Sequence, residues 1–276
     1  MKKTFLFLIA AATLCACSQK PAETATQSTG KSLILYYSQT NATRQVAQLL
    51  QQKTGADIDS IVAQQPYNGD FNETIIRCQK EFADSIAPEI KPLSRNIAEY
   101  DTIYLGYPVW FGTYAQPVAG LIKSVDLSGK VIIPFCTFGS GGLRTSTSRL
   151  ATALPQAKLL QGFGIRGART EAASAELDQF LIRIGVKPGS LQKLPDYGEE
   201  RKVTDADKKV FDAACGSYPM PLGTPVTVCT RETDTATDYE FVTESTTPDG
   251  QPMHTRICIS VSKAEGAIPE FIQAIR

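Results

Sequence analysis

Histidine and tryptophan are almost absent from this 276-residue sequence, which contains one of each. Basic and acidic residues balance at 28 each, and no basic stripe indicates a nucleic-acid partner. The seven cysteines include no C-x-x-C pair, so neither a zinc site nor a thioredoxin-type redox couple is indicated. The sequence also shows no Ser/His/Asp arrangement and no clear pair of carboxylates for acid–base work. We therefore assign no catalytic residue and expect His254 to lie on the surface.

The longest apolar run lies at the N-terminus. Lys2 and Lys3 precede apolar residues 5–14, which are too few for a stable membrane span. The run ends in Leu14-Cys15-Ala16-Cys17, which resembles the lipobox of bacterial lipoproteins. The resemblance implies a signal peptide at residues 1–16, an acylated Cys17 and a lipid anchor in a bacterial cell envelope. A simple secretory signal is the alternative.

The residues after this leader are polar. Residues 17–30 are rich in Ser, Thr and Gln, which predicts a flexible tether. Ser18 follows the expected lipidated cysteine, where an aspartate would indicate retention in an inner membrane. The outer membrane is therefore favoured if the source is Gram-negative.

Residues 33–43 are the most informative stretch of the chain. They read as an apolar strand, a hydroxyl-rich turn and the start of an amphipathic helix. Backbone N–H groups at the helix start, with the hydroxyls of Ser38, Thr40 and Thr43, suit a phosphate monoester. The turn itself contains no Lys or Arg, which a triphosphate would require. A helix that is capped and binds nothing is the alternative.

Two later strands end in loops of complementary chemistry. Residues 101–106 lead into an aromatic loop, and residues 130–136 lead into a glycine-rich loop. In a doubly wound parallel sheet, ligands bind outside the carboxyl ends of the strands. Together the three loops could hold a phosphate, a flat apolar ring and the polar edge of that ring.

These motifs resemble the flavodoxin family. The loops read G-Y-P-x-W-x-G-T from Gly106 and C-T-x-G-x-G from Cys136, and the resemblance covers residues 31–186. It implies an α/β three-layer fold with a five-stranded parallel sheet in the order 2-1-3-4-5. It also implies FMN, bound without a covalent bond. Residues implied to surround the FMN phosphate are Ser38, Thr40, Asn41, Ala42 and Thr43. Residues implied to contact the isoalloxazine are Pro108, Val109, Trp110, Phe111, Gly112, Thr137, Phe138, Gly139, Ser140 and Gly141.

Two positions depart from the family pattern. Asn41 stands where glycine is usual, and asparagine is the non-glycine residue that best tolerates positive φ. Phe111 stands where a second tryptophan is common, which keeps aromatic area but loses an indole N–H. A third motif, the G-x-G-x-x-G from Gly162, falls within a predicted strand and is therefore not expected to bind a dinucleotide.

The rest of the chain divides into two parts. Pro and Gly among charged residues predict a linker at 187–203, followed by a small α+β domain at 204–276 that resembles the cystatins in its helix-then-meander order. Cys229 and Cys258 are expected on the polar face of its sheet, where they could bridge only if their strands come within reach. In the first domain, Cys136 is expected to be a small buried hydrophobe. Further helices are expected at 72–85, 117–125, 143–154 and 174–184, and further strands at 56–61 and 158–165.

The sequence thus predicts an envelope protein that uses FMN. We expect it to transfer electrons to a partner protein or to reduce a small acceptor such as a quinone. A surface-anchored binding module without redox activity, built on the same scaffold, is the alternative.

Overall fold

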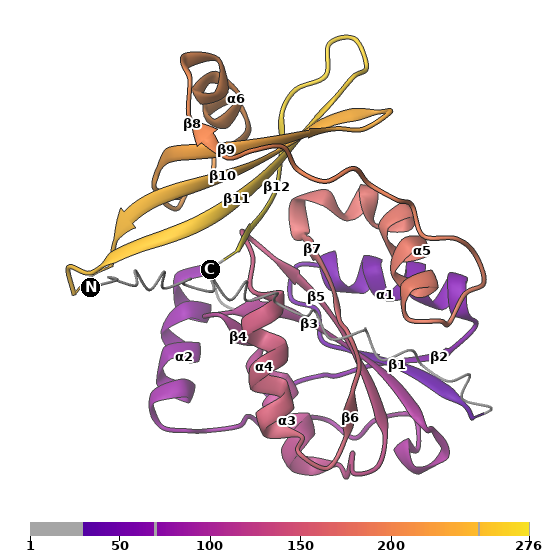
Figure 1. The fold of residues 1–276 in the computed structure, drawn as a ribbon. Coiled ribbons are helices and arrows are strands. Elements are labelled where there is room, and N and C mark those ends of the chain that lie inside the picture. Colours follow the sequence, from indigo (N-terminus) through magenta and orange to yellow (C-terminus); the bar gives the residue numbers. More distant parts are fainter. Residues whose placement is uncertain (1–29, 69–70, 248, 276) are drawn as a thin grey trace, which may run out of the picture.

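The computed structural model describes residues 30–68, 71–247 and 249–275 (Figure 1). The expected signal peptide, the lipidated Cys17 and most of the tether lie outside the described residues. Within the described ranges, every helix is too short or too polar to cross a bilayer.

A parallel sheet forms the larger part of the molecule (Figure 1). Its strand order is β2-β1-β3-β5-β6, with β7 also paired to β5, which is the predicted order 2-1-3-4-5 once β6 and β7 are taken as one interrupted strand. A short strand, β4, returns antiparallel on the end of β3. The strands are β1 (Ser32–Tyr36), β2 (Asp57–Ser60), β3 (Thr102–Trp110), β4 (Thr113–Tyr114), β5 (Val131–Phe138), β6 (Lys158–Leu159) and β7 (Phe163–Arg166). The predicted flavodoxin-like fold is confirmed.

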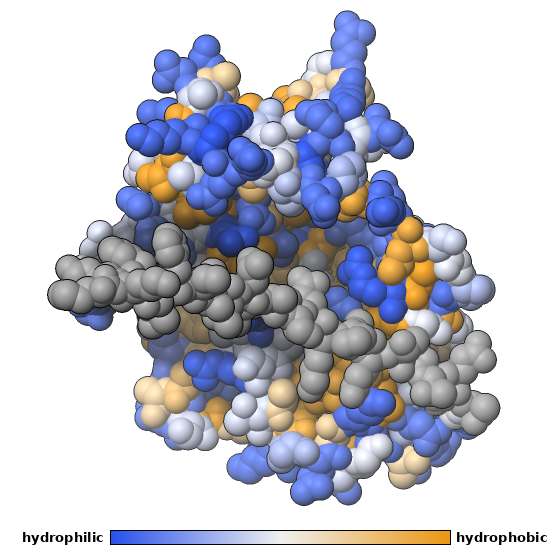
Figure 2. Space-filling view, in the orientation of Figure 1, coloured by the Kyte–Doolittle hydropathy of each residue, from blue (hydrophilic) through white to orange (hydrophobic). Residues whose placement is uncertain are grey.

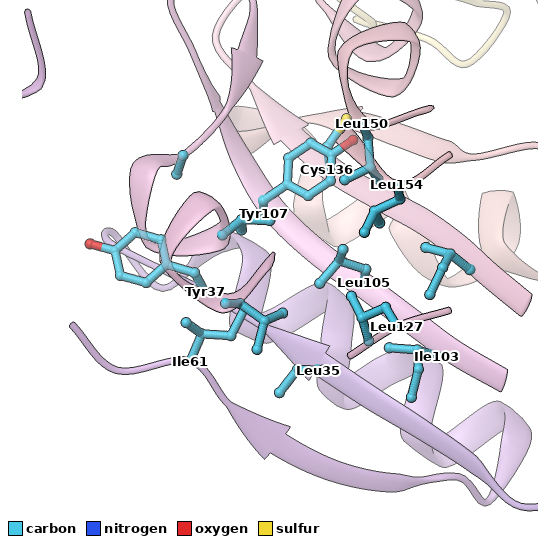
Figure 3. Close-up of a cluster of buried hydrophobic side chains, with 14 of the residues drawn as sticks. Leu35, Tyr37, Ile61, Ile103, Leu105, Tyr107, Leu127, Cys136, Leu150 and Leu154 are labelled. Carbon is cyan, nitrogen blue, oxygen red and sulfur yellow. The ribbon is translucent and has the colours of Figure 1, made fainter. Parts of the chain in front are cut away.

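Helices cover both faces of this sheet, because its strands are apolar on both sides. Leu35 and Leu105 point into one buried cluster beside α3 and α4, part of which Figure 3 shows. Ile34 and Tyr104, one residue away on the same strands, belong to a second cluster beneath α1 and α5. The helices are α1 (Ala42–Thr54), α2 (Phe71–Ala83), α3 (Gln116–Ser124), α4 (Leu143–Ala153) and α5 (Ala173–Arg183), with 3-10 turns at Ile97–Glu99 and Gly167–Ala172.

The fifth parallel strand is interrupted, whereas the sequence predicts one strand over 158–165. The structure has two short strands, β6 and β7, instead of one. Each pairs with β5, and residues 160–162 lie between them. The gap lies opposite the middle of β5, where Pro134 supplies no N–H to a ladder. A Cβ at Gly162 would lie 3.1 Å from the Pro134 carbonyl oxygen, so the backbones approach closely here.

An antiparallel sheet with one helix forms the second part of the chain, residues 201–275, which we call the module. Its strands follow the order β12-β11-β10-β9-β8, and the buried Phe211 of α6 lies edge-to-face against Phe241 of the sheet. On the face shown in Figure 2, hydrophilic residues cover most of the module, and a recess separates it from the parallel sheet domain. Its elements are β8 (Arg201–Lys202), α6 (Asp205–Cys215), β9 (Thr224–Glu232), β10 (Ala236–Thr246), β11 (Pro252–Ser262) and β12 (Glu270–Ile275).

The module differs from the prediction at its two edges. The predicted helix and three long strands are present, but β12 was not predicted and β8 lies in the stretch assigned to the linker. Cys229 and Cys258 both lie opposite Glu240, on the strands that flank β10. They are therefore two strand spacings apart, about 9–10 Å, which exceeds the reach of a disulfide. All five cysteines within the described residues are free thiols.

Candidate cofactor site

The three predicted loops meet at one pocket of about 630 Å³, which we call the cofactor pocket. It lies at the carboxyl ends of the parallel strands, where the fold is expected to place a ligand. Residues of the first, second and third loops all line it. The predicted site residues that line it are Thr40, Ala42, Pro108, Val109, Trp110, Thr137, Phe138 and Gly139.

The first loop turns sharply before α1. Asn41 has φ 71°, in the left-handed region that glycine adopts most easily. Asparagine therefore replaces the usual glycine here without changing the turn. Its carbonyl oxygen accepts the first helical hydrogen bond, from Gln45 N at 3.0 Å. The turn thereby delivers the start of α1, beginning with Ala42, to the edge of the pocket.

The three hydroxyls of this loop have different surroundings. Ser38 Oγ accepts a hydrogen bond from Arg44 N at 3.2 Å, so it caps α1. The Thr43 hydroxyl is buried and lies 2.8 Å from the Thr137 hydroxyl. Of the three, only Thr40 lines the cofactor pocket. Ser38 and Asn41 instead line a neighbouring pocket beside β2.

Trp110, the only tryptophan, is held by an aromatic cluster. Tyr37 and Tyr67 meet its ring edge-to-face, with centroids 5.6 and 5.3 Å away. Tyr67 in turn donates to Glu81 at 2.6 Å, and Arg77 lies over the Tyr67 ring at 3.7 Å while bonding Glu81 at 2.8 Å. Burial is the main cause that raises the pKa of Tyr67, and the bond to Glu81 adds to it. The indole therefore enters the pocket from a fixed position.

Phe111 does not line the cofactor pocket. It has φ 49°, its side chain is 54% exposed, and its ring contacts Phe82 of α2 at 5.7 Å between centroids. The positive φ turns the chain here, and Gly112 continues the turn at φ 74°. The second aromatic of the motif is thus directed toward α2, which the sequence could not reveal.

The third loop separates two pockets. Thr137 and Phe138 are buried, and Cys136 is fully buried, as predicted. Burial raises the pKa of the Cys136 thiol, so the thiolate is disfavoured. Beyond Gly139 lies an adjoining pocket of about 520 Å³, lined by Gly112, Ser140 and Gly141 among others. Val109, Gly139 and Tyr218 line both pockets.

Two further segments, which the sequence did not predict, also line the cofactor pocket. Arg166 ends β7, and Gly167 and Ala168 follow it. Arg166 and Gly167 are the last two residues of the G-x-G-x-x-G motif. A fifth strand ending at this edge of the sheet is the signal that could have found them. The end of α6 and the turn after it add Ala214, Ser217, Tyr218 and Pro219, for which the sequence offers no signal.

Arg166 forms hydrogen bonds to both parts of the chain. It donates to the Gly139 carbonyl at 2.7 Å and to the Phe271 carbonyl at 2.8 Å. Burial lowers the pKa of its guanidinium, as expected for a desolvated cation. Its carbonyl partners leave it a poor candidate for pairing with a phosphate.

The chemistry of the pocket suits a flavin mononucleotide. Its lining combines the Thr40 hydroxyl and the start of α1 with the aromatic side chains of Trp110 and Phe138, and it contains no carboxylate. Among the described residues, no group of three metal-ligating side chains occurs. His254 is exposed on the module and lies outside the pocket, as predicted.

Comparisons with known proteins found similar solved structures and one family model. Similar solved structures include proteins from Bacteroides eggerthii and Bacteroides uniformis, each 29% identical to this chain. They cover 57% and 54% of it and 99% and 98% of their own chains, with TM-scores of 0.48 and 0.49. A flavoprotein in complex with FMN from Lactobacillus acidophilus is 21% identical over 54% of this chain and 97% of its own, with a TM-score of 0.47.

The sequence model of the Flavodoxin family matches residues 31–180. No curated protein sequence matches the chain. Since the family match spans more than half of the chain and agrees with the observed sheet order, this protein belongs to the flavodoxin family.

Proposed function

We propose that this chain binds FMN and transfers electrons to an acceptor at the bacterial cell envelope. The observation that carries the proposal is the meeting of three loops at one pocket, whose lining combines the Thr40 hydroxyl and the start of α1 with aromatic side chains. Membership of the flavodoxin family supports FMN as the cofactor.

Each loop has a distinct part in holding FMN. Thr40 and the first backbone N–H groups of α1 would bind the phosphate, since a helix start favours an anion. The indole of Trp110, held by Tyr37 and Tyr67, would pack against the isoalloxazine and exclude water from it. Backbone groups of residues 137–139 would bond its polar edge. FMN supplies one- and two-electron chemistry, and the protein sets its orientation and surroundings.

The acceptor is proposed to be a small quinone-like molecule or a partner protein. The adjoining pocket of about 520 Å³ supports the first, because its size falls in the range of small-molecule sites. It shares Val109 and Gly139 with the cofactor pocket, so its occupant would lie close to the flavin.

The envelope setting rests on the sequence. The Leu14-Cys15-Ala16-Cys17 motif supports a lipid anchor on Cys17, and the polar residues that follow would let the folded part extend from the membrane surface. Globomycin sensitivity of processing and labelling of Cys17 with a fatty acid would test the anchor, with Cys17→Ser as the control.

The first experiment is an FMN titration of the chain lacking residues 1–17. A flavin spectrum on purification, or quenching of FMN fluorescence at micromolar protein or below, is expected. If neither occurs in a folded sample, the redox proposal is wrong and the surface-anchored binding module becomes the better account.

A further inference from the structure

We propose that the module completes the cofactor pocket and that Tyr218 contacts the bound flavin directly. This inference rests on the proposed function. It assigns a cofactor-contacting residue from outside residues 31–180, where the family match ends.

Tyr218 reaches the pocket from the turn that follows α6. It lines the cofactor pocket together with Ala214, Ser217 and Pro219, and it also lines the adjoining pocket. Its hydroxyl oxygen lies 3.1 Å from the point where a Cβ on Gly139 would be. The phenol thus lies directly against the third loop, at the boundary between the two pockets.

The ring of Tyr218 is held by the core of the module. It meets Phe271 edge-to-face at 5.5 Å between centroids, and Phe271 is buried. Arg166 lies 4.2 Å from the Phe271 ring centre and 5.6 Å from that of Tyr218. Because these contacts restrict its rotamers, the phenol can contact a ligand at little further cost in entropy.

The module is seated on the third loop by backbone contacts. Ala274 N of β12 donates to the Ser140 carbonyl at 2.6 Å. A Cβ on Gly141 would lie only 2.0 Å from the Ala274 carbonyl oxygen, so this approach requires glycine. Glu270 adds an ion pair to Arg169, with 3.0 Å between its Oε1 and Arg169 Nε.

Two aromatic side chains from different parts of the chain therefore line one pocket. Trp110 comes from the end of β3, and Tyr218 comes from the module. A ligand that touches both stabilises the docked arrangement, and by linkage a docked module increases the affinity for that ligand. Cofactor binding and module docking are thereby coupled.

The test compares the FMN affinity of three variants with that of the unsubstituted protein, each produced as the chain lacking residues 1–17. Tyr218→Ala is expected to weaken FMN binding by about 2- to 12-fold, the range of an aromatic pair. Tyr197→Ala is the matched control, because Tyr197 also lies beneath an arginine, Arg231 at 4.6 Å, and does not line the pocket. Tyr218→Phe tests whether the ring or the hydroxyl makes the contact.

Amide hydrogen exchange of the unsubstituted protein is a second measurement, which needs no variant to fold. In the unmodified chain, FMN is expected to slow exchange at the amides of Ser217 and Tyr218 and in β12, which contact or border the pocket. If FMN binds but Tyr218→Ala matches Tyr197→Ala, and these amides are unaffected, the inference is wrong while the proposed function stands. If FMN fails to bind the unmodified chain, the proposed function itself is wrong.

Discussion

Thr43 and Thr137 share a buried hydrogen bond, with their hydroxyl oxygens 2.8 Å apart across 94 positions of sequence. Thr43 lies in the first turn of α1, and Thr137 lies at the end of β5. The bond therefore connects the start of α1 to the end of β5, beside the cofactor pocket that Thr137 lines.

Thr43→Val should destabilise the fold, because it leaves the Thr137 hydroxyl buried without a partner. The expected cost in the free energy of unfolding is about 1–3 kcal/mol, measured by urea denaturation. Thr152→Val is the control, since that hydroxyl is exposed and bonds only a carbonyl of its own helix. The double variant Thr43→Val/Thr137→Val should recover part of the loss. A single variant as stable as the control would show that the bond contributes nothing.

Thr40→Ala should weaken FMN binding more than Ser38→Ala. Thr40 lines the cofactor pocket, and a hydrogen bond to a charged phosphate contributes about 1.5–3 kcal/mol, which corresponds to roughly tenfold or more in affinity. Ser38 caps α1, so its removal should instead lower stability by about 1 kcal/mol. Fluorescence titration and urea denaturation of both variants separate the two effects. Equal affinities for the two variants would contradict the assignment of Thr40.

Asn41→Gly should be tolerated, and Asn41→Val should not. Asn41 has φ 71°, where a β-branched side chain is strained by about 1–2 kcal/mol. Thermal unfolding should show the valine variant melting several degrees below the natural chain and the glycine variant close to it. A stable valine variant would mean that the turn can relax to negative φ.

Asp207 should make the module sensitive to acid. Its carboxylate accepts from both Arg201 Nη atoms at 2.6 and 2.9 Å and from Thr204 N at 2.9 Å, and these bonds, with Arg201 the largest cause, lower its pKa well below 3.8. A lowered pKa in the folded state means that the stability is fully present above pH 4 and is lost as the pH falls further.

Asp207→Asn should lower the free energy of unfolding by about 1–3 kcal/mol at pH 7 and flatten its dependence on pH below 4. The control is Asp212→Asn, on the same helix but exposed. Unfolding followed by urea titration at pH 3, 4 and 7 tests both statements. The same acid sensitivity in Asp207→Asn as in the natural chain would assign the effect to another carboxylate.

The sequence predicted the parallel sheet because its strands and turns carry strong local signals. The apolar residues 33–35 and 131–133 predict strands, and the turns that come after these strands indicate the ligand edge. The strand order was implied by the resemblance to the flavodoxin family. The interruption of the fifth strand depends on Pro134 of the neighbouring strand, a pairing that no local window contains. The strand β12 was missed for a different reason, since Glu270–Ile275 shows no clear alternation of polar and apolar residues.

The sequence could predict only those pocket residues that lie at or just after strand ends. Thr40, Trp110 and Gly139 are such residues, because the fold places ligands at the carboxyl ends of its strands. The outward turn at Phe111 depends on its contact with Phe82, and the approach of Tyr218 depends on how two sheets meet. Such contacts depend on tertiary packing, which the spacing of residues in a sequence does not predict.

Both ends of the antiparallel sheet are partly covered by other segments of the chain. On β12, Ala274 N and the Phe271 carbonyl are bonded to Ser140 and Arg166 of the parallel sheet domain. At the other end, the short strand β8 pairs with β9, and the β9 carbonyls of Thr230 and Val226 accept from Gly198 and Val203, on either side of β8. An unpaired edge is a template for association with other chains. Residues 198–203 beside β9 and the contacts of β12 with the parallel sheet domain thus leave fewer backbone groups for pairing with a strand of another copy.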